Sequence, residues 1–101
     1  MERKKEKVMK EFLKERLKDP DYRKFHEEEK FRTLFGEQVA SARKKAKMSV
    51  KDLADRVGVP EKAISNIEKG EYKKMTLKTL LETAFAMRMR IKVDFVPWTD
   101  D

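Results

Sequence analysis

Apolar residues recur at helical spacing over most of this chain. The first such run has Lys and Glu between its apolar positions, which are Val8, Met9, Phe12, Leu13 and Leu17. Residues three and four apart share one face of a helix, so the run predicts an amphipathic helix. Asp19-Pro20 predicts a break, because Asp19 is a suitable cap and Pro20 fits the first turn of a second helix. That shorter helix carries Tyr22, Phe25 and His26.

A longer apolar face follows and predicts the first helix of a compact domain. Its positions are Phe31, Leu34, Phe35, Val39, Ala42 and Ala46. This helix is expected to end near Lys47, and Met48-Ser49 interrupts the pattern. Gly36 lies inside the helix, where glycine costs about 1 kcal/mol relative to alanine.

Residues 49–70, SVKDLADRVGVPEKAISNIEKG, predict two short helices joined by a glycine turn. Ser49 can cap the first helix, and Gly58 ends it because glycine adopts the left-handed conformation of a tight turn. Pro60 starts the second helix and Gly70 ends it. The buried positions are Val50, Leu53, Ala54, Val57, Ala63, Ile64 and Ile67. This plan is the helix-turn-helix, whose second helix enters the major groove of DNA.

The pattern changes near the C-terminus. Thr76 opens a last helix whose expected buried residues are Leu77, Leu80, Leu81, Ala84 and Phe85. Residues 90–96 then alternate polar and apolar, which predicts one half-buried strand closed by Pro97. A lone strand needs a partner, and no second strand is evident. We expect a two-fold dimer that pairs this strand with itself through Ile91, Val93 and Phe95; pairing with the arm or with another protein is the alternative.

Charge and composition narrow the function. The chain has 101 residues, 26 Lys and Arg, 19 Asp and Glu and a net charge of +7. The excess is +3 over residues 2–33 and +4 over residues 34–76, and residues 77–101 are balanced. An anionic polymer is therefore a plausible partner. With no cysteine and one histidine, no metal site or cofactor is expected. No uncharged run approaches a membrane span, so we expect a cytoplasmic protein.

An enzyme is not expected. Glu27-Glu28-Glu29 lacks a convergent partner, and no nucleophile with a base or phosphate-binding glycine loop occurs. We read the chain as mainly α, with a helical arm over residues 1–33, a domain over residues 34–90, and a strand and tail over residues 91–101.

The domain resembles the XRE family of phage-repressor-like helix-turn-helix proteins. The resemblance is carried by Leu53-Ala54, Gly58-Val59, Ile64-Ser65, Ile67-Glu68 and Gly70. It implies a five-helix domain in which Arg43 pairs with Glu68 as a structural brace. It also implies that Glu61, Lys62 and Asn66 read bases. A lysine can donate hydrogen bonds to guanine O6 and N7, an asparagine can pair with adenine N6 and N7, and a glutamate can accept from cytosine N4. The alternative for these three is helix solubility and, for Glu61, a favourable place at a positive helix end.

Two positions depart from the family pattern. Val50 cannot bond a phosphate, and Pro60 has no amide to donate. The DNA backbone contacts are therefore assigned to Ser49, Lys51, Lys73 and Lys74. Because of these departures, the operator of a relative cannot be carried over to this chain.

Nearly the whole chain also resembles antitoxins of the HigA (host-inhibition-of-growth) type. The similar parts are the charged arm with its break over residues 17–20, the XRE-like domain, and the Ile-x-Val-x-Phe-Val-Pro ending over residues 91–97. The resemblance implies repression of its own operon and neutralisation of a RelE-like messenger-RNA-cleaving toxin. Its candidate toxin contacts are Phe12, Leu13, Leu17, Tyr22 and Phe25; alternatively, this stripe covers the protein's own core. A stand-alone repressor and a protein-interaction module built on the helix-turn-helix are the competing functions.

Overall fold

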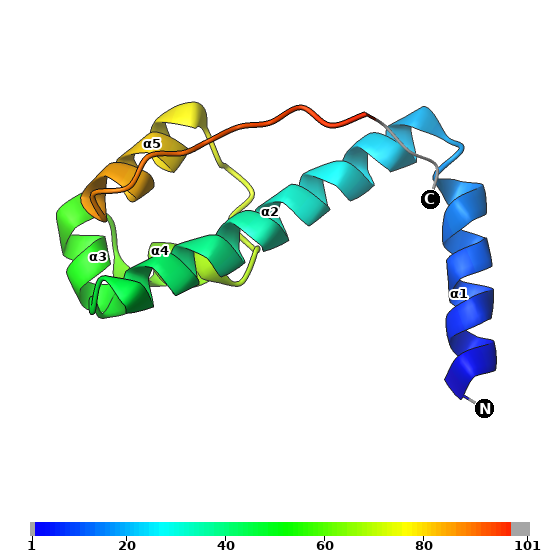
Figure 1. Ribbon diagram of the computed structural model, residues 1–101, viewed down its shortest axis with the longest axis horizontal. Helices are drawn as coiled ribbons and strands as arrows, with labels where there is room; N and C mark the ends of the chain where they lie inside the picture. The colour runs from blue at the N-terminus through cyan, green and yellow to red at the C-terminus, as the bar shows by residue number, and fades with distance from the viewer. Residues whose placement is uncertain (1, 98–101) are drawn as a thin grey trace. The chain divides into compact units, whose positions relative to one another are not determined.

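The computed structural model describes residues 2–97, with side chains from residue 9 onward. Within that range it has five helices and no strand (Figure 1). The helices are α1 (Glu2–Arg16), α2 (Pro20–Lys45), α3 (Val50–Val57), α4 (Glu61–Glu68) and α5 (Leu77–Ala86). None of them is both long and apolar enough to cross a membrane. The mainly helical fold class is confirmed, and residues 31–94 form a unit separate from residues 2–30.

The break predicted at the end of the arm's first helix is present. The Asp21 amide donates to the Asp19 carboxylate at 3.0 Å, and α2 begins at Pro20. The prediction that two helices follow this break was wrong, because α2 continues without interruption to Lys45. No proline lies between residues 21 and 45, and the one glycine, Gly36, does not break the helix.

The predicted cap and stop of α3 are both confirmed. The Ser49 hydroxyl accepts from the Asp52 amide at 3.0 Å, and the Ser49 amide donates to the Asp52 carboxylate at 2.9 Å. Hydrogen bonding from Ser49 to the carboxylate, above all from its backbone amide, lowers the pKa of Asp52, because it favours the charged form. Gly58 ends the helix with φ 84°, in the left-handed region.

Helices α2 to α5 all end in the same kind of turn. A residue with positive φ follows each helix, and the next amide donates to the carbonyl five residues before it. The left-handed residues are Lys47 (φ 56°), Gly58 (φ 84°), Gly70 (φ 75°) and Arg88 (φ 57°). Only two of the four are glycine, so the positions of glycine in the sequence predict only two of these four helix ends.

The hydrophobic core lies between α3, the helices that contact it and the end of α2. Helix α3 packs against both α4 and α5. The buried residues of this cluster are Val39, Met48, Leu53, Ala54, Ile64, Ile67 and Met87. They hold the two helices of the helix-turn-helix in a fixed relation.

Helix α5 buries only part of the face that was predicted: Leu80 and Ala84 are covered, whereas Leu77, Leu81 and Phe85 are not. Thr83 and Ala84 are buried and Leu80 is half-buried. Leu77 and Phe85, by contrast, are 70% and 83% exposed, and Leu81 is exposed as well. The helix is apolar on two sides, so the periodicity alone could not show which side faces the core. The result is an apolar stripe on the surface at positions i, i+4 and i+8.

The predicted C-terminal strand is not supported. Residues 91–97 have no strand structure, and all of them, including Ile91, Val93 and Phe95, are exposed. The physical reason is that a strand is defined by hydrogen bonds to a neighbour, and the described part of the chain offers none. Lys92 Nζ lies 3.9 Å from Asp94 Oδ2, which places these two side chains on one side of the segment.

Gly36 allows α2 to approach the end of α4 closely. A Cβ atom at this position would lie 2.7 Å from the Glu68 carbonyl oxygen, and closer still to that of Ile67. Both are backbone atoms of the last turn of α4, so no side-chain rotation relieves the clash. The glycine that was expected only to be tolerated is therefore required by the packing.

Candidate nucleic-acid interface

The connection between α3 and α4 has the geometry of a helix-turn-helix. Three residues, Gly58 to Pro60, join the helices, and Gly58 supplies the left-handed turn. Pro60 is the N-cap of α4 and makes no side-chain cap bond, so the helix begins one residue later than predicted. The short turn fixes α4 as the second helix of the motif.

The predicted base-reading residues lie away from the core side of α4. Ile64 and Ile67 are 0% and 2% exposed, and they define the inward direction. At about 100° per residue, Lys62 lies about 10° and Asn66 about 50° from the opposite direction. Glu61 lies about 90° from it, on the flank of the helix. Lys62 and Glu61 are exposed and Asn66 is half-buried.

Arg43 and Glu68 form a bidentate ion pair. Arg43 Nε donates to Glu68 Oε2 at 2.7 Å and Nη2 donates to Oε1 at 3.1 Å. Their side chains are 12% and 13% exposed. The hydrogen bonds with Glu68 raise the pKa of Arg43, although burial acts in the opposite direction. The remaining guanidinium nitrogen of Arg43, Nη1, donates to the Met48 carbonyl oxygen at 2.9 Å.

This ion pair fixes the recognition helix at its C-terminal end. Arg43 lies near the end of α2, Met48 in the connection to α3, and Glu68 at the end of α4. One guanidinium therefore ties together three parts of the domain, and Gly36 brings the same two helices into backbone contact. Arg43 belongs to α2, and Glu68 is not one of the residues on the outward face of α4.

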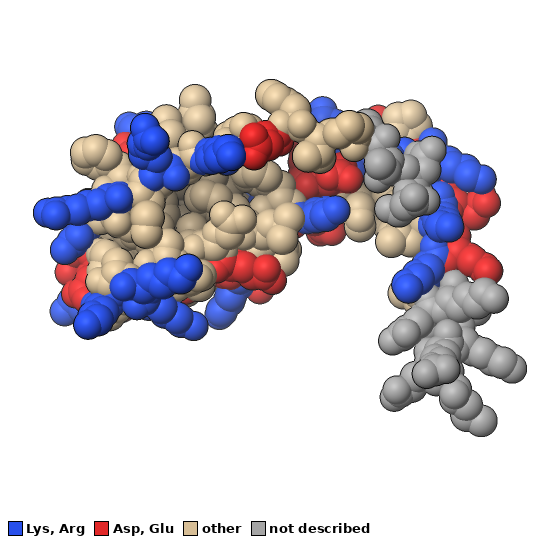
Figure 2. Space-filling view, viewed as in Figure 1, with Lys and Arg blue, Asp and Glu red and all other residues tan. Residues whose placement is uncertain are grey.

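The residues assigned to the DNA backbone are all exposed. Ser49 and Lys51 stand at the start of α3, and Lys73 and Lys74 lie in the connection before α5. The Ser49 oxygen accepts the capping bond, which leaves its hydroxyl hydrogen free to donate. Figure 2 shows lysine and arginine side chains gathered at the end of the domain where α2 ends and α3 lies.

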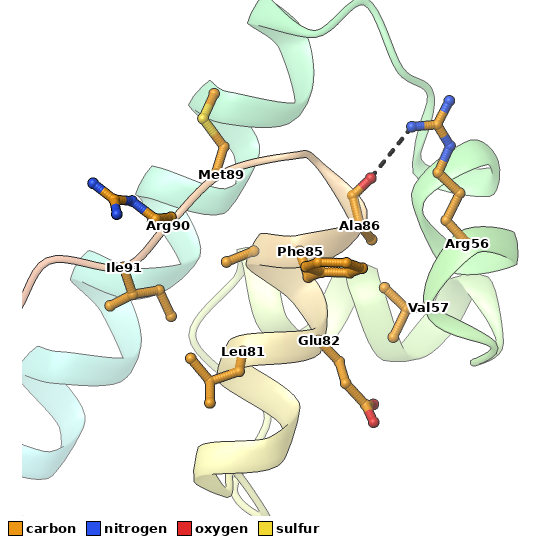
Figure 3. Close-up of a pocket in the computed structure, with 10 residues that line it drawn as sticks. Arg56, Val57, Leu81, Glu82, Phe85, Ala86, Met89, Arg90 and Ile91 are labelled. Atoms are coloured by element: carbon orange, nitrogen blue, oxygen red, sulfur yellow. Dashed lines mark hydrogen bonds between the residues drawn. The ribbon is translucent and has the colours of Figure 1, made fainter.

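A second surface feature is an open apolar groove on α5. It has a volume of about 770 Å³ and includes Val57, Leu81, Phe85, Met89 and Ile91 among its lining residues. Figure 3 shows Phe85 between Val57 and Leu81, and Arg56 bonded to the Ala86 carbonyl. That bond, from Arg56 Nη1, measures 3.3 Å and ties α3 to the end of α5. The groove lies at the start of the C-terminal segment.

The candidate toxin contacts lie in the unit of residues 2–30. Phe12 and Phe25 are exposed, and Leu13, Leu17 and Tyr22 are half-buried. The Arg16 guanidinium lies over the Phe12 ring at 5.0 Å and over the Tyr22 ring at 5.2 Å. It contacts a ring from each of α1 and α2, at distances typical of cation–π contacts.

Three structural roles had no clear signal in the sequence. These are the close approach at Gly36, the Arg43 bond to Met48, and the Arg56 bond to Ala86. Each involves a backbone carbonyl, which every residue carries, so residue type does not reveal the partner. Of these three roles, the sequence indicated only the presence of Gly36, a residue unfavourable in a helix that stands within a strong helical pattern.

Comparison with known proteins matches a stretch of the chain to a family model. Residues 39–84 match the family model described as Helix-turn-helix. No curated protein and no solved structure matches the chain. The match covers the end of α2 and nearly all of the segment through α5, including the whole turn and α4. Over residues 39–84, somewhat under half of the chain, the protein is therefore similar to the helix-turn-helix family.

Proposed function

We propose that this protein is a homodimeric regulator that binds operator DNA through α4. The observation that carries the proposal is the outward face of α4, where Lys62 and Asn66 stand opposite the buried Ile64 and Ile67. These two side chains suit guanine and adenine edges in the major groove, and Glu61 on the flank suits cytosine N4. Ser49, Lys51, Lys73 and Lys74 hold the phosphates.

Alanine at Lys62 or Asn66 is expected to weaken binding to the cognate site by about 1 to 3 kcal/mol. Each change removes hydrogen bonds to a base edge and leaves nonspecific binding intact. Alanine at Lys73 is expected to weaken binding to all sequences and to lower the slope of log K against log salt by about 1. Fluorescence anisotropy on cognate and scrambled duplexes at several salt concentrations measures both effects. Equal losses on the two duplexes for Lys62→Ala would refute base reading by that residue.

Two surface features support the homodimer. The segment 91–96 alternates polar and apolar residues but has no partner strand within residues 2–97. The apolar groove on α5 reaches Ile91, at the beginning of the same segment. A second copy related by a two-fold axis covers both features and presents two α4 helices about 34 Å apart, the spacing of successive major grooves.

A substitution that introduces a charge into the C-terminal segment tests whether this segment forms the dimer interface. Val93→Asp is expected to convert the dimer to a monomer and to weaken binding to a two-half-site operator by tenfold or more. Val93 is exposed, so the change leaves the core of the domain intact. Lys92→Ser, at the adjacent position, is the control. Sedimentation velocity gives the oligomeric state, and a Val93→Asp protein that sediments as the wild type does would exclude this segment from the interface.

We further propose that the protein is an antitoxin whose arm binds a RelE-like messenger-RNA-cleaving toxin. The support is the resemblance of nearly the whole chain to HigA-type antitoxins, together with the exposed Phe12 and Phe25 of the arm. Exposed aromatic side chains are a common feature of protein-binding surfaces. The toxin to test is any small ribonuclease whose gene lies next to the gene of this protein.

Co-expression separates the antitoxin from the competing functions. Growth arrest by that ribonuclease is expected to be relieved by the wild-type protein but not by Phe12→Asp/Phe25→Asp, which keeps its DNA affinity. Operator binding without any relief of arrest identifies a stand-alone repressor. Relief of arrest without DNA binding identifies an interaction module that uses the helix-turn-helix as a scaffold.

A further inference from the structure

We infer that two copies of the chain pair their C-terminal segments in one antiparallel register, with Val93 of each copy on the two-fold axis. In this register Phe95 of one copy enters the apolar groove on α5 of the other. The inference rests on the proposed homodimer and specifies which residues of the two copies meet. Both residues are available for these contacts, because Val93 and Phe95 are exposed in the structure.

The alternation of the segment determines which side chains share a face. Successive side chains of an extended strand point to opposite faces, so Ile91, Val93 and Phe95 share one face and Lys92 and Asp94 share the other. The structure agrees, because Lys92 Nζ and Asp94 Oδ2 lie 3.9 Å apart and Ile91 lines the groove. Residues directly opposite each other in a sheet share a face. Apolar side chains therefore meet apolar ones only if one residue of the segment stands opposite itself on the two-fold axis.

Charge distinguishes the three central registers. With Val93 on the axis, Lys92 of each copy stands opposite Asp94 of the other, which gives two pairs of opposite charge. With Lys92 on the axis two lysines face each other, and with Asp94 on the axis two aspartates do. Like charges directly opposite are destabilising in a sheet, whereas opposite charges stabilise it.

The two outer registers fit less well. With Ile91 on the axis, Lys92 stands opposite Arg90, so like charges meet twice. With Phe95 on the axis, an aspartate stands opposite a valine, and residues 90–96 form no pair of opposite charges. The middle register is therefore the one of the five that pairs opposite charges and opposes no like charges.

The same register brings Phe95 of the second copy to the groove on α5. Phe95 then stands opposite Ile91, and facing residues of an antiparallel pair have Cβ atoms about 4.5 to 5.5 Å apart. Ile91 lines the groove together with Leu81 and Phe85 (Figure 3). In an extended segment the chain's own Phe95 lies about 13 Å beyond Ile91, too far along to take this position. Each copy thus supplies the ring that covers the groove of the other.

Disulfide cross-linking tests the register. The chain has no cysteine, so each of Lys92→Cys, Val93→Cys and Asp94→Cys carries a single thiol. Ser41→Cys, at an exposed position of α2, is the control for random collision. Residues on the axis have Cα atoms about 4.5 to 5.5 Å apart, within the range of a disulfide, whereas either neighbour is about 8 Å from its own copy. Under mild oxidation Val93→Cys is expected to form covalent dimer about tenfold faster than the other three variants.

Charge reversal tests the two predicted ion pairs. Lys92→Asp places carboxylates opposite each other on both sides of the axis and is expected to raise the dimer Kd about tenfold or more. Lys92→Asp/Asp94→Lys restores opposite charges, and its Kd is expected to lie within about threefold of the wild-type value. Lys92→Ser removes the attraction of an exposed side chain without adding repulsion, so its Kd is expected to change by about threefold or less. Sedimentation velocity over a range of concentrations measures each Kd.

A double-mutant cycle tests the groove contact. Phe95→Ala and Phe85→Ala are each expected to raise the dimer Kd about tenfold, because each removes an aromatic ring from the same contact. The double variant is expected to raise the Kd by less than the product of the two single effects. Both residues are exposed, so these changes leave the core intact. Single effects that multiply in the double variant would refute the entry of Phe95 into the groove.

The outcomes separate this inference from the proposed function. If the wild type sediments as a monomer, the proposed homodimer fails and the inference fails with it, whereas DNA binding by α4 is measured independently. If the wild type is a dimer but Lys92→Cys or Asp94→Cys links fastest, or the double reversal does not restore the Kd, the homodimer stands and the register centred on Val93 is refuted. If no variant links faster than Ser41→Cys, the dimer uses another surface and the inference is overturned.

Discussion

Gly36→Ala is expected to lower the free energy of unfolding by about 2 to 3 kcal/mol, near the upper end of the usual range for overpacking. The added methyl group meets the carbonyl oxygens of Ile67 and Glu68, which belong to the backbone of α4. Backbone atoms cannot rotate away, so the whole last turn of α4 must move. The better helix propensity of alanine returns only about 1 kcal/mol.

Gly58→Ala is the matched control for this change. Gly58 has φ 84°, but an added Cβ there has no neighbour within 4 Å. Its cost is therefore backbone strain alone, about 1 to 2 kcal/mol. Urea unfolding of both variants, followed by circular dichroism, measures the difference. A Gly36→Ala protein as stable as the wild type would mean that α2 and α4 do not approach as closely as the structure shows.

Arg43→Met is expected to cost about 3 kcal/mol, at the lower end of the range for breaking a buried ion pair. The change leaves the Glu68 carboxylate without its two donors in a site where only 13% of the side chain is exposed. It also removes the donor to the Met48 carbonyl. Urea unfolding gives the loss, and thermal melting is expected to show the same order of variants.

Two further variants identify the source of that loss. Lys78→Met removes the exposed partner of Glu82, 3.8 Å away, and is expected to change stability by less than about 0.5 kcal/mol. The double variant Arg43→Met/Glu68→Met removes both charges and is expected to recover much of the stability. If the double variant is no more stable than Arg43→Met alone, the unpaired carboxylate is not the cause of the loss.

Local signals in the sequence predicted the local parts of the fold. The start of α2 at Pro20, the cap at Ser49 and the stop at Gly58 depend on atoms a few residues apart, so residue type was sufficient. The inward face of α4 also followed from spacing alone, because its apolar residues occupy one side only.

Features that depend on distant partners were not predictable in the same way. The role of Gly36 depends on carbonyls more than 30 residues later in the chain. The buried face of α5 depends on which of two apolar sides meets α3, and the sequence favours neither. The predicted strand at residues 90–96 needs a partner strand, and none lies within the described residues 2–97.

The two non-glycine residues with positive φ that follow α2 and α5 are sites where a substitution is expected to stabilise the domain. Lys47 and Arg88 have φ values of 56° and 57°, a conformation that costs an ordinary residue about 1 to 2 kcal/mol relative to glycine. Each also carries a positive charge beside a helix C-terminus, where the helix dipole favours it. Glycine at these two sites offers a route to a more stable domain without any change in the core. That gain lowers the positive charge of the protein by two, so thermal stability and attraction to a polyanion cannot both be maximised there.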